Sequence, residues 1–304
     1  MDGKVMLKEF VRFYCNSDNT AKSYVRTVSD YIGFCEREFG WSMEQTVLNS
    51  NKRSILTYLS GMEDRGLSPY TVNLSRSALK TFFQYCGEFD YRTKENPVLT
   101  VKRSNTSGVE QKSPYLEEDE FRRLVQATQV KTGKTKKFEF TSARDKLLLT
   151  LNLTLGLRAS ESLNLKVQQL QSDTLTIVGK GNKLRKLRVT DDIRECFKDY
   201  MNVRHMAYDS GTQDEGYVFV TINGNQLGIK DFNKNLKKYA ERAEITKDIA
   251  SHALRRSCAT HYLNNGVPLA QVAKALGHKN TSTTMRYYKE SGDSLDFIAG
   301  LGLY

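Results

Sequence analysis

The sequence predicts a mostly helical protein of two domains, with a small β-sheet in the second domain. Three observations lead to this fold class. Apolar residues recur at helical spacing through the first hundred positions, a polar segment without periodicity follows, and one later stretch alternates like a β-hairpin. With 304 residues, the chain is long enough for two domains that each bury a core. We therefore expect a helical domain at residues 1–101, a linker at 102–113 and a mixed domain at 114–304.

The helices expected in the first domain have recognisable ends. An apolar stripe at helical spacing runs through residues 17–40 and stops at Gly40. A second helix is expected near residues 51–66. The third helix begins with Ser68 as its N-cap and Pro69 in the first helical position, where a proline is well tolerated.

The second domain combines helices with one hairpin. Acidic residues near position 118 suit the first turn of a helix, and an apolar helix is expected over residues 142–155, ending at Gly156. Residues 173–189 alternate on either side of a Gly-Asn turn, which predicts a β-hairpin with Lys180 at the end of its first strand. An amphipathic helix is expected over residues 228–245. Its buried stripe comprises Phe232, Leu236, Tyr239, Ala240 and Ala243.

The composition limits the classes of function. The formal net charge is +11, and a basic protein of this size is drawn to polyanions, most often to nucleic acid. No apolar run has the length of a membrane span, and the first residues lack the apolar core of a signal peptide. The five cysteines are scattered and include no C-x-x-C pair, which favours free thiols over disulfides or structural zinc. We therefore expect a cytoplasmic protein without a membrane partner.

Two helices carry side chains that suit a DNA backbone, although a solvated helix face would carry the same residue types. On the helix that begins at Ser68, these residues are Asn73, Arg76 and Lys80. On the helix at 228–245, they are Lys230, Lys234, Lys237 and Lys238.

The segment 251–289 contains three of the four histidines. His252 and Arg255 are three residues apart, so a helix presents both on one face. His261 is about half a turn out of phase with His252 and is expected to pack or to support the site. A short helix over 269–276 should end at Gly277, which leaves His278 just past a helix end.

These residue types favour phosphate chemistry over metal binding. No His-x-x-x-His pair is present, and no carboxylate or cysteine stands beside the histidines at ligand spacing, so we expect neither a metal nor another cofactor. Arginine holds phosphate through a planar fork of donors. A pocket of such cations can stabilise the transition state of phosphoryl transfer, and a tyrosine hydroxyl can serve as nucleophile if a base accepts its proton.

Several motifs match those of one known family. HALRRSCATHYLNNG, LGH and TTMRYY match its C-terminal motif, GLRASESLNL matches the motif around its first arginine, and IVGKGNK matches its hairpin lysine. LSPYTVNLSRSALKTFFQYC is similar to its helical, SAM-like core-binding domain. In these motifs, and over nearly its whole length, the chain resembles the tyrosine recombinases, also called phage integrases, which include Xer-like enzymes. The resemblance implies a C-shaped clamp, with the core-binding domain and the α/β catalytic domain on opposite sides of a DNA duplex.

The resemblance also implies roles for individual residues. Arg158 would bind a non-bridging phosphate oxygen, helped by a helix N-terminus, and Arg255 would be the second phosphate clamp. Lys180 would protonate the departing 5′ oxygen. His252 would exchange a proton with the nucleophile.

The nucleophile and its neighbours complete this set. Tyr287 would attack the DNA and form a 3′-phosphotyrosine, which keeps the energy of the phosphodiester, so that rejoining needs neither ATP nor a metal. His278 would donate a hydrogen bond to the phosphate or orient the pocket. Two of the assignments have rivals nearby. Tyr288 lies about 100° round the same helix from Tyr287, and Lys183 shares the hairpin with Lys180.

Two further positions bear on the match. Arg256 stands where members of the family commonly have histidine. Because Arg256 points to a different helix face from Arg255, we expect no loss of chemistry. Glu161 matches a frequent family position and is expected to have only a supporting role.

The function that the resemblance implies is site-specific DNA recombination through a Holliday junction, for the integration, excision or resolution of a mobile element or replicon. Its partner would be double-stranded DNA with paired recombination sites, bound by a homotetramer. The apolar C-terminal tail would dock on a neighbouring subunit or fold back on its own domain. Relaxation of DNA in the manner of a type IB topoisomerase is one alternative. A non-catalytic DNA-binding protein is another, although binding alone needs no nucleophile.

Overall fold

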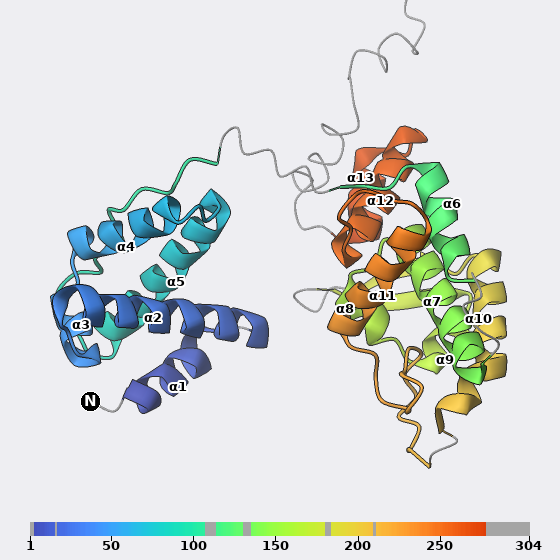
Figure 1. The fold of residues 1–304 in the computed structure, drawn as a ribbon, viewed down its shortest axis with the longest axis horizontal. Coiled ribbons are helices and arrows are strands. Elements are labelled where there is room, and N and C mark those ends of the chain that lie inside the picture. Colours follow the sequence, from blue (N-terminus) through green and yellow to red (C-terminus); the bar gives the residue numbers. More distant parts are fainter. Residues whose placement is uncertain are drawn as a thin grey trace, which may run out of the picture. The chain divides into compact units, whose positions relative to one another are not determined.

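The structure, a computed structural model, describes residues 3–15, 17–106, 114–129, 135–179, 184–208 and 211–277. The chain divides into two compact units, Met1–Gln111 and Lys112–Tyr304 (Figure 1). The described residues are mostly helical and contain one two-stranded sheet, as the sequence predicts. None of the helices among them combines the length and apolar character that crossing a membrane requires.

The first unit is built of helices. In chain order they are α1 (Gly3–Tyr14), α2 (Asp18–Phe39), α3 (Met43–Asn49), α4 (Lys52–Asp64) and α5 (Pro69–Glu88). The predicted ends of α2 and α5 are confirmed. Gly40 caps α2 in the left-handed conformation at φ 67°, and the side chain of Ser68 accepts the backbone N–H of Thr71 at the start of α5.

The core of the first unit contains large aromatic side chains and buried polar groups that have partners. Tyr31, on the predicted apolar stripe of α2, is fully buried, and its hydroxyl lies 2.9 Å from the hydroxyls of Ser50 and Ser54. The buried hydroxyl of Tyr31 therefore has hydrogen-bond partners, as polar groups shielded from water require. Arg92 is also buried and donates hydrogen bonds to carbonyl oxygens at the end of α3, among them that of Ser50 at 2.7 Å. The carboxyl end of α3, whose carbonyls lack partners within the helix, is thereby fixed.

The second unit is larger and carries the sheet. Its elements are α6 (Glu118–Ala127), α7 (Lys136–Leu155), α8 (Ala159–Leu163), α9 (Val167–Leu170), β1 (Thr174–Val178), β2 (Leu184–Arg188), α10 (Asp191–Arg204), the 3₁₀ helix η1 (His205–Tyr208), α11 (Ile229–Arg242), α12 (Ser251–Asn264) and α13 (Leu269–Leu276). The predicted hairpin is confirmed. Its two strands are antiparallel, and Val178 pairs with Leu184, whereas the predicted Gly-Asn turn lies outside the described residues.

Helix α7 runs through the core of the second unit and packs against both α10 and α12 (Figure 1). It begins at Lys136, six residues before the predicted start, because the side chain of Thr135 caps it by accepting the N–H of Phe138. Its end at Gly156 is as predicted. The apolar stripe predicted for α11 is buried as well, which fixes that helix against the same core.

Candidate active site

The turn after α7 depends on glycine. Gly156 has φ 59°, in the left-handed region that favours glycine. A Cβ atom built on it would lie 2.4 Å from Cδ2 of Leu276 and 3.0 Å from Sγ of Cys258. The end of α7 therefore approaches α12 and α13 more closely than any side chain at this position would allow.

Arg158 follows this turn and directly precedes α8. Its backbone N–H donates to Oε2 of Glu161 at 2.8 Å, and its Nη1 donates to Oε1 of the same carboxylate at 2.7 Å. The side chain of Arg158 stays 31% exposed, so it is only partly buried. Helix α8 has five residues and begins directly after Arg158, whose own N–H is taken by Glu161, and the expected help of this helix N-terminus in holding a phosphate stays a prediction.

Arg255, on α12, is buried and lies near the same carboxylate. Its Nη1 donates to the carbonyl oxygen of Gly156 at 2.8 Å, and its Nη2 donates to the carbonyl oxygen of Leu276. Nη1 also lies 3.9 Å from Oε2 of Glu161. Arg255 thus holds together the ends of α7 and α13, and it does so beside Arg158.

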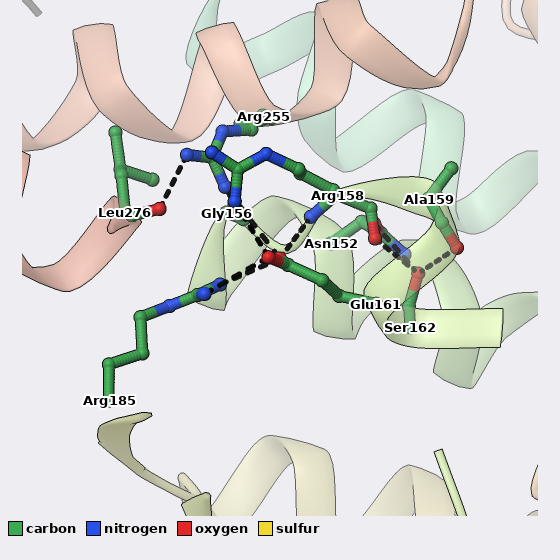
Figure 2. Close-up of polar contacts among 9 residues, drawn as sticks. All are labelled: Asn152, Gly156, Arg158, Ala159, Glu161, Ser162, Arg185, Arg255 and Leu276. Atoms are coloured by element: carbon green, nitrogen blue, oxygen red, sulfur yellow. Dashed lines mark hydrogen bonds and ion pairs between the residues drawn. The ribbon is translucent and has the colours of Figure 1, made fainter. Parts of the chain in front are cut away.

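Glu161 is the centre of this group, as Figure 2 shows. Besides the contacts from Arg158 and Arg255, it accepts two hydrogen bonds from Arg185 on β2, at 3.0 Å to Oε1 and 2.7 Å to Oε2. Burial by itself raises the pKa of Glu161. The hydrogen bonds from Arg185 and from the Arg158 backbone, together with the positive charge around it, outweigh burial and lower the pKa to about 2. Glu161 is therefore a carboxylate at any physiological pH.

The start of α12 is held by a side chain from α11. Ala250, the N-cap residue of α12, provides no side-chain cap. Oδ1 of Asn233 accepts the backbone N–H of Ser251 at 2.9 Å instead. This contact fixes the turn that carries His252, which is exposed. His261 is also exposed, and its ring lies beside that of Phe121, so it packs against a neighbouring side chain at the surface.

The structure brings together Arg158 and Arg255, and it adds Glu161 and Arg185 to them. His252 is on the same helix as Arg255, one turn nearer its start. The other predicted members of the site and their rivals lie outside the described residues. They are Lys180, Lys183, His278, Tyr287 and Tyr288.

The candidate DNA contacts of the first unit have different surroundings. Nδ2 of Asn73 donates to the carbonyl oxygen of Ser104, and Oδ1 accepts the Ser104 N–H. Nε of Arg76 donates to the carbonyl oxygen of Val101 at 2.7 Å. These contacts fasten residues 98–104 to α5, a structural role that the sequence did not reveal. Lys80 is exposed.

The lysines of α11 lie on its exposed face, opposite the buried stripe. They are Lys230, Lys234, Lys237 and Lys238. The Nζ atom of Lys237 lies 3.1 Å from a carboxylate oxygen of Asp248, and both side chains are well exposed. Such an exposed pair contributes little stability, so Lys237 can leave Asp248 for another anion. Contact of the α11 lysines with DNA stays a prediction.

Three guanidinium groups around one carboxylate form a net positive cluster suited to an anion such as phosphate. Within the described ranges, no group of histidine, cysteine and acidic residues is arranged to hold a metal ion. Sequence reasoning missed Arg185. Its signal was the alternation of β2, which puts Arg185 on the same face as the buried Leu187.

Comparison with known proteins identifies the family of the chain. The phage integrase family matches residues 114–293, and the N-terminal SAM-like domain of phage integrases matches residues 6–93. The tyrosine recombinase XerD of Oceanobacillus iheyensis is 31% identical over 274 residues, which cover 89% of this chain and 87% of that protein. The tyrosine recombinase XerC of Staphylococcus carnosus is 29% identical over 291 residues, covering 93% and 90%.

Solved structures share the fold. The XerH site-specific recombinase bound to a palindromic difH substrate, in a post-cleavage complex, superposes with a TM-score of 0.70 at 20% identity, over 97% of this chain and 94% of that one. A lambda integrase dimer bound to a core site gives a TM-score of 0.71 at 15% identity, over 96% and 97%. The chain therefore belongs to the phage integrase family and is a tyrosine-type site-specific recombinase. These matches do not favour the topoisomerase alternative.

Proposed function

We propose that the protein cleaves and rejoins double-stranded DNA at paired recombination sites, through a 3′-phosphotyrosine on Tyr287 and a Holliday junction. The observation that carries the proposal is the convergence of Arg158 and Arg255 on one place beside the end of α13. That helix ends at Gly277, and His278 is the next residue in the chain. Two arginines gathered from distant parts of the sequence are what a scissile phosphate needs in order to bind and to gain stabilisation as it becomes pentavalent.

The cleavage step follows from these roles. The phenolic oxygen of Tyr287 attacks the phosphorus while His252 takes its proton. The bond from phosphorus to the 5′ oxygen breaks, and Lys180 supplies the proton to that departing oxygen. Arg158 and Arg255 neutralise the charge on the non-bridging oxygens. The 5′ hydroxyl of a partner strand then attacks the phosphotyrosine and releases the tyrosine, so the number of phosphodiester bonds does not change.

The proposed assembly is a homotetramer on two DNA sites, in which each protomer clamps the duplex with its two domains, 1–101 and 114–304, joined by the linker 102–113. Exposed lysines on α11 and Lys80 on α5 would contact phosphates, which makes binding weaken with salt. We propose that the C-terminal tail docks on a neighbouring subunit. Truncation after Ser291 tests this docking, because a complex on DNA that keeps its mass would contradict it.

The element served is proposed to be a mobile element or a replicon that is integrated, excised or resolved. The five cysteines are free thiols, which supports a cytoplasmic location. Sequencing the DNA that is covalently attached to protein recovered from its host would identify the site and the element. Attachment to chromosomal DNA at random positions would contradict the site-specific proposal.

A plasmid assay separates the proposed reaction from its alternatives. Purified protein is incubated with a supercoiled plasmid that carries two copies of the DNA site to which the protein becomes covalently attached. The buffer contains EDTA and no ATP. Recombined products are expected. Relaxation without recombination would indicate a topoisomerase-like reaction, and binding without either would indicate a non-catalytic DNA-binding protein.

A further inference from the structure

Arg185 lies at the junction of the hairpin, α8 and the end of α13, and the proposed reaction assigns it no task. Its side chain is only 8% exposed, and its two terminal nitrogens take both oxygens of Glu161. This bidentate geometry fits the planar fork of arginine and cannot be copied by the single ammonium of lysine. Figure 2 shows the guanidinium reaching Glu161 from the side opposite to α12.

Gly277 fixes the other side of Arg185. A Cβ atom on Gly277 would lie 3.2 Å from Nη1 and 3.3 Å from Cδ of Arg185, so the arginine lies across a residue without a side chain. Gly277 follows Leu276, whose carbonyl oxygen accepts a hydrogen bond from Arg255. Two arginines from different elements therefore meet at the end of α13.

The charges around Glu161 show what Arg185 changes. Three guanidinium groups and one carboxylate give the cluster a formal charge of +2, and removal of Arg185 would leave +1. Among the described residues, the carboxylate would then keep Arg158 and Arg255 as its partners, and it would compete with DNA phosphate for both. With Arg185 in place, both carboxylate oxygens are satisfied from the side of the hairpin.

We propose that Arg185 is a positioning residue. It takes up both oxygens of the Glu161 carboxylate, so that Glu161 aligns Arg158 and Arg255 for the scissile phosphate and competes less with that phosphate for them. The inference rests on the proposed function, since it concerns how the same phosphate is held. Arg185 itself does not touch the reacting atoms. It acts through the two arginines. Its removal is therefore expected to weaken the stabilisation of the negative charge on the non-bridging oxygens and to leave the protonation of the leaving group unchanged.

The test uses the full-length protein and a duplex that carries the cleavage site identified by covalent trapping. The variants are Arg185→Met, which removes the fork, and Arg185→Lys, which keeps the charge and loses the bidentate contact. Arg188→Met is the matched control, because Arg188 is an exposed arginine of the same strand. Melting temperature and circular dichroism establish that each variant is folded. If Arg185→Met does not fold, the test is made on Arg185→Lys.

Three scissile linkages distinguish the possible roles. On the native phosphodiester, Arg185→Met is expected to slow the formation of the covalent adduct by about 10- to 100-fold. That is less than the roughly 10²–10³-fold cost of deleting a direct donor. On a methylphosphonate, which lacks the charge on one non-bridging oxygen, the defect should shrink to about threefold or less. With sulfur in place of the 5′ bridging oxygen, which leaves without a proton, the defect should persist.

Four outcomes would overturn the inference. They are an unchanged rate for Arg185→Met on the native linkage, an equal loss in Arg188→Met, a defect that methylphosphonate leaves unchanged, and a defect that the bridging sulfur repairs. The last result would assign Arg185 to the proton donor of the leaving group instead. Adduct formation by the parent protein distinguishes a failure of this inference from a failure of the proposed function. If the parent protein forms no covalent adduct on the native duplex, the proposed reaction itself fails.

Discussion

Replacing Gly156 by alanine should destabilise the second unit and, at the same time, disturb the positions of Arg158 and Arg255. The left-handed backbone at φ 59° costs a residue with a Cβ atom about 1–2 kcal/mol. The new methyl group would lie 2.4 Å from Leu276 Cδ2, and forcing such extra volume into a packed core costs about 1–3 kcal/mol. We expect the Gly156→Ala variant to lose about 2–5 kcal/mol of unfolding free energy.

Gly266 provides a matched control in the same unit. It has φ 76°, and a Cβ atom built there would meet nothing within 4 Å. Gly266→Ala therefore carries the backbone cost alone, about 1–2 kcal/mol. The difference between the two variants isolates the collision of the methyl group with α12 and α13.

Urea unfolding can assign the loss to one unit, because the chain has a single tryptophan, Trp41, and it lies in the first unit. Circular dichroism follows both units, whereas tryptophan fluorescence follows the first. Gly156→Ala should shift the dichroism transition and leave the fluorescence transition in place. The reasoning would be refuted by equal losses in the two glycine variants, or by a shift of the fluorescence transition.

Three other predictions concern the ion cluster, the start of α12 and the core of the first unit. The pKa of Glu161 is lowered to about 2, so its charged form adds stability above about pH 4.5 that is lost as the pH falls towards 2. We expect Glu161→Gln to remove at most about 3 kcal/mol of the change in unfolding free energy between these pH values, as measured by unfolding at a series of acid pH values. An unaltered pH profile would contradict the ion cluster. Asn233→Ala should cost about 1 kcal/mol and speed hydrogen exchange of the Ser251 amide about fivefold, as measured by NMR, whereas unchanged exchange would exclude the cap. Arg92→Met should destabilise the first unit by about 3 kcal/mol or more, read from the fluorescence of Trp41, because it leaves buried carbonyls unpaired, and a loss below about 1 kcal/mol would contradict this role.

Local signals account for the parts of the fold that could be predicted from the sequence. Ser68 and Pro69 define the start of α5, and Gly156 defines the end of α7, because capping and left-handed turns involve only neighbouring residues. The segment from 191 to 204 forms α10, which the sequence reasoning did not assign. That helix packs on α7, and its place is set by burial against a distant element rather than by its own ends.

The candidate site divides in the same way. Arg158, His252 and Arg255 could be chosen because their motifs are short and contiguous. The contacts of Arg185 and Asn233 could not be predicted, since each joins two separate elements, to a partner 24 positions away for Arg185 and 18 positions away for Asn233. A long-range partner leaves no local pattern. Only the fold shows that a strand residue reaches α8 and that one helix caps the next.

Mapping the covalent link between protein and DNA tests the central claim most directly. The parent protein is incubated with a duplex that carries the cleavage site identified by covalent trapping. The complex is digested with nuclease and protease and analysed by mass spectrometry. The Tyr287→Phe and Tyr288→Phe variants are treated in parallel. We predict one nucleotide-bearing peptide, modified at Tyr287, in the parent and in Tyr288→Phe, and none in Tyr287→Phe. A covalent adduct that persists in Tyr287→Phe would contradict the account.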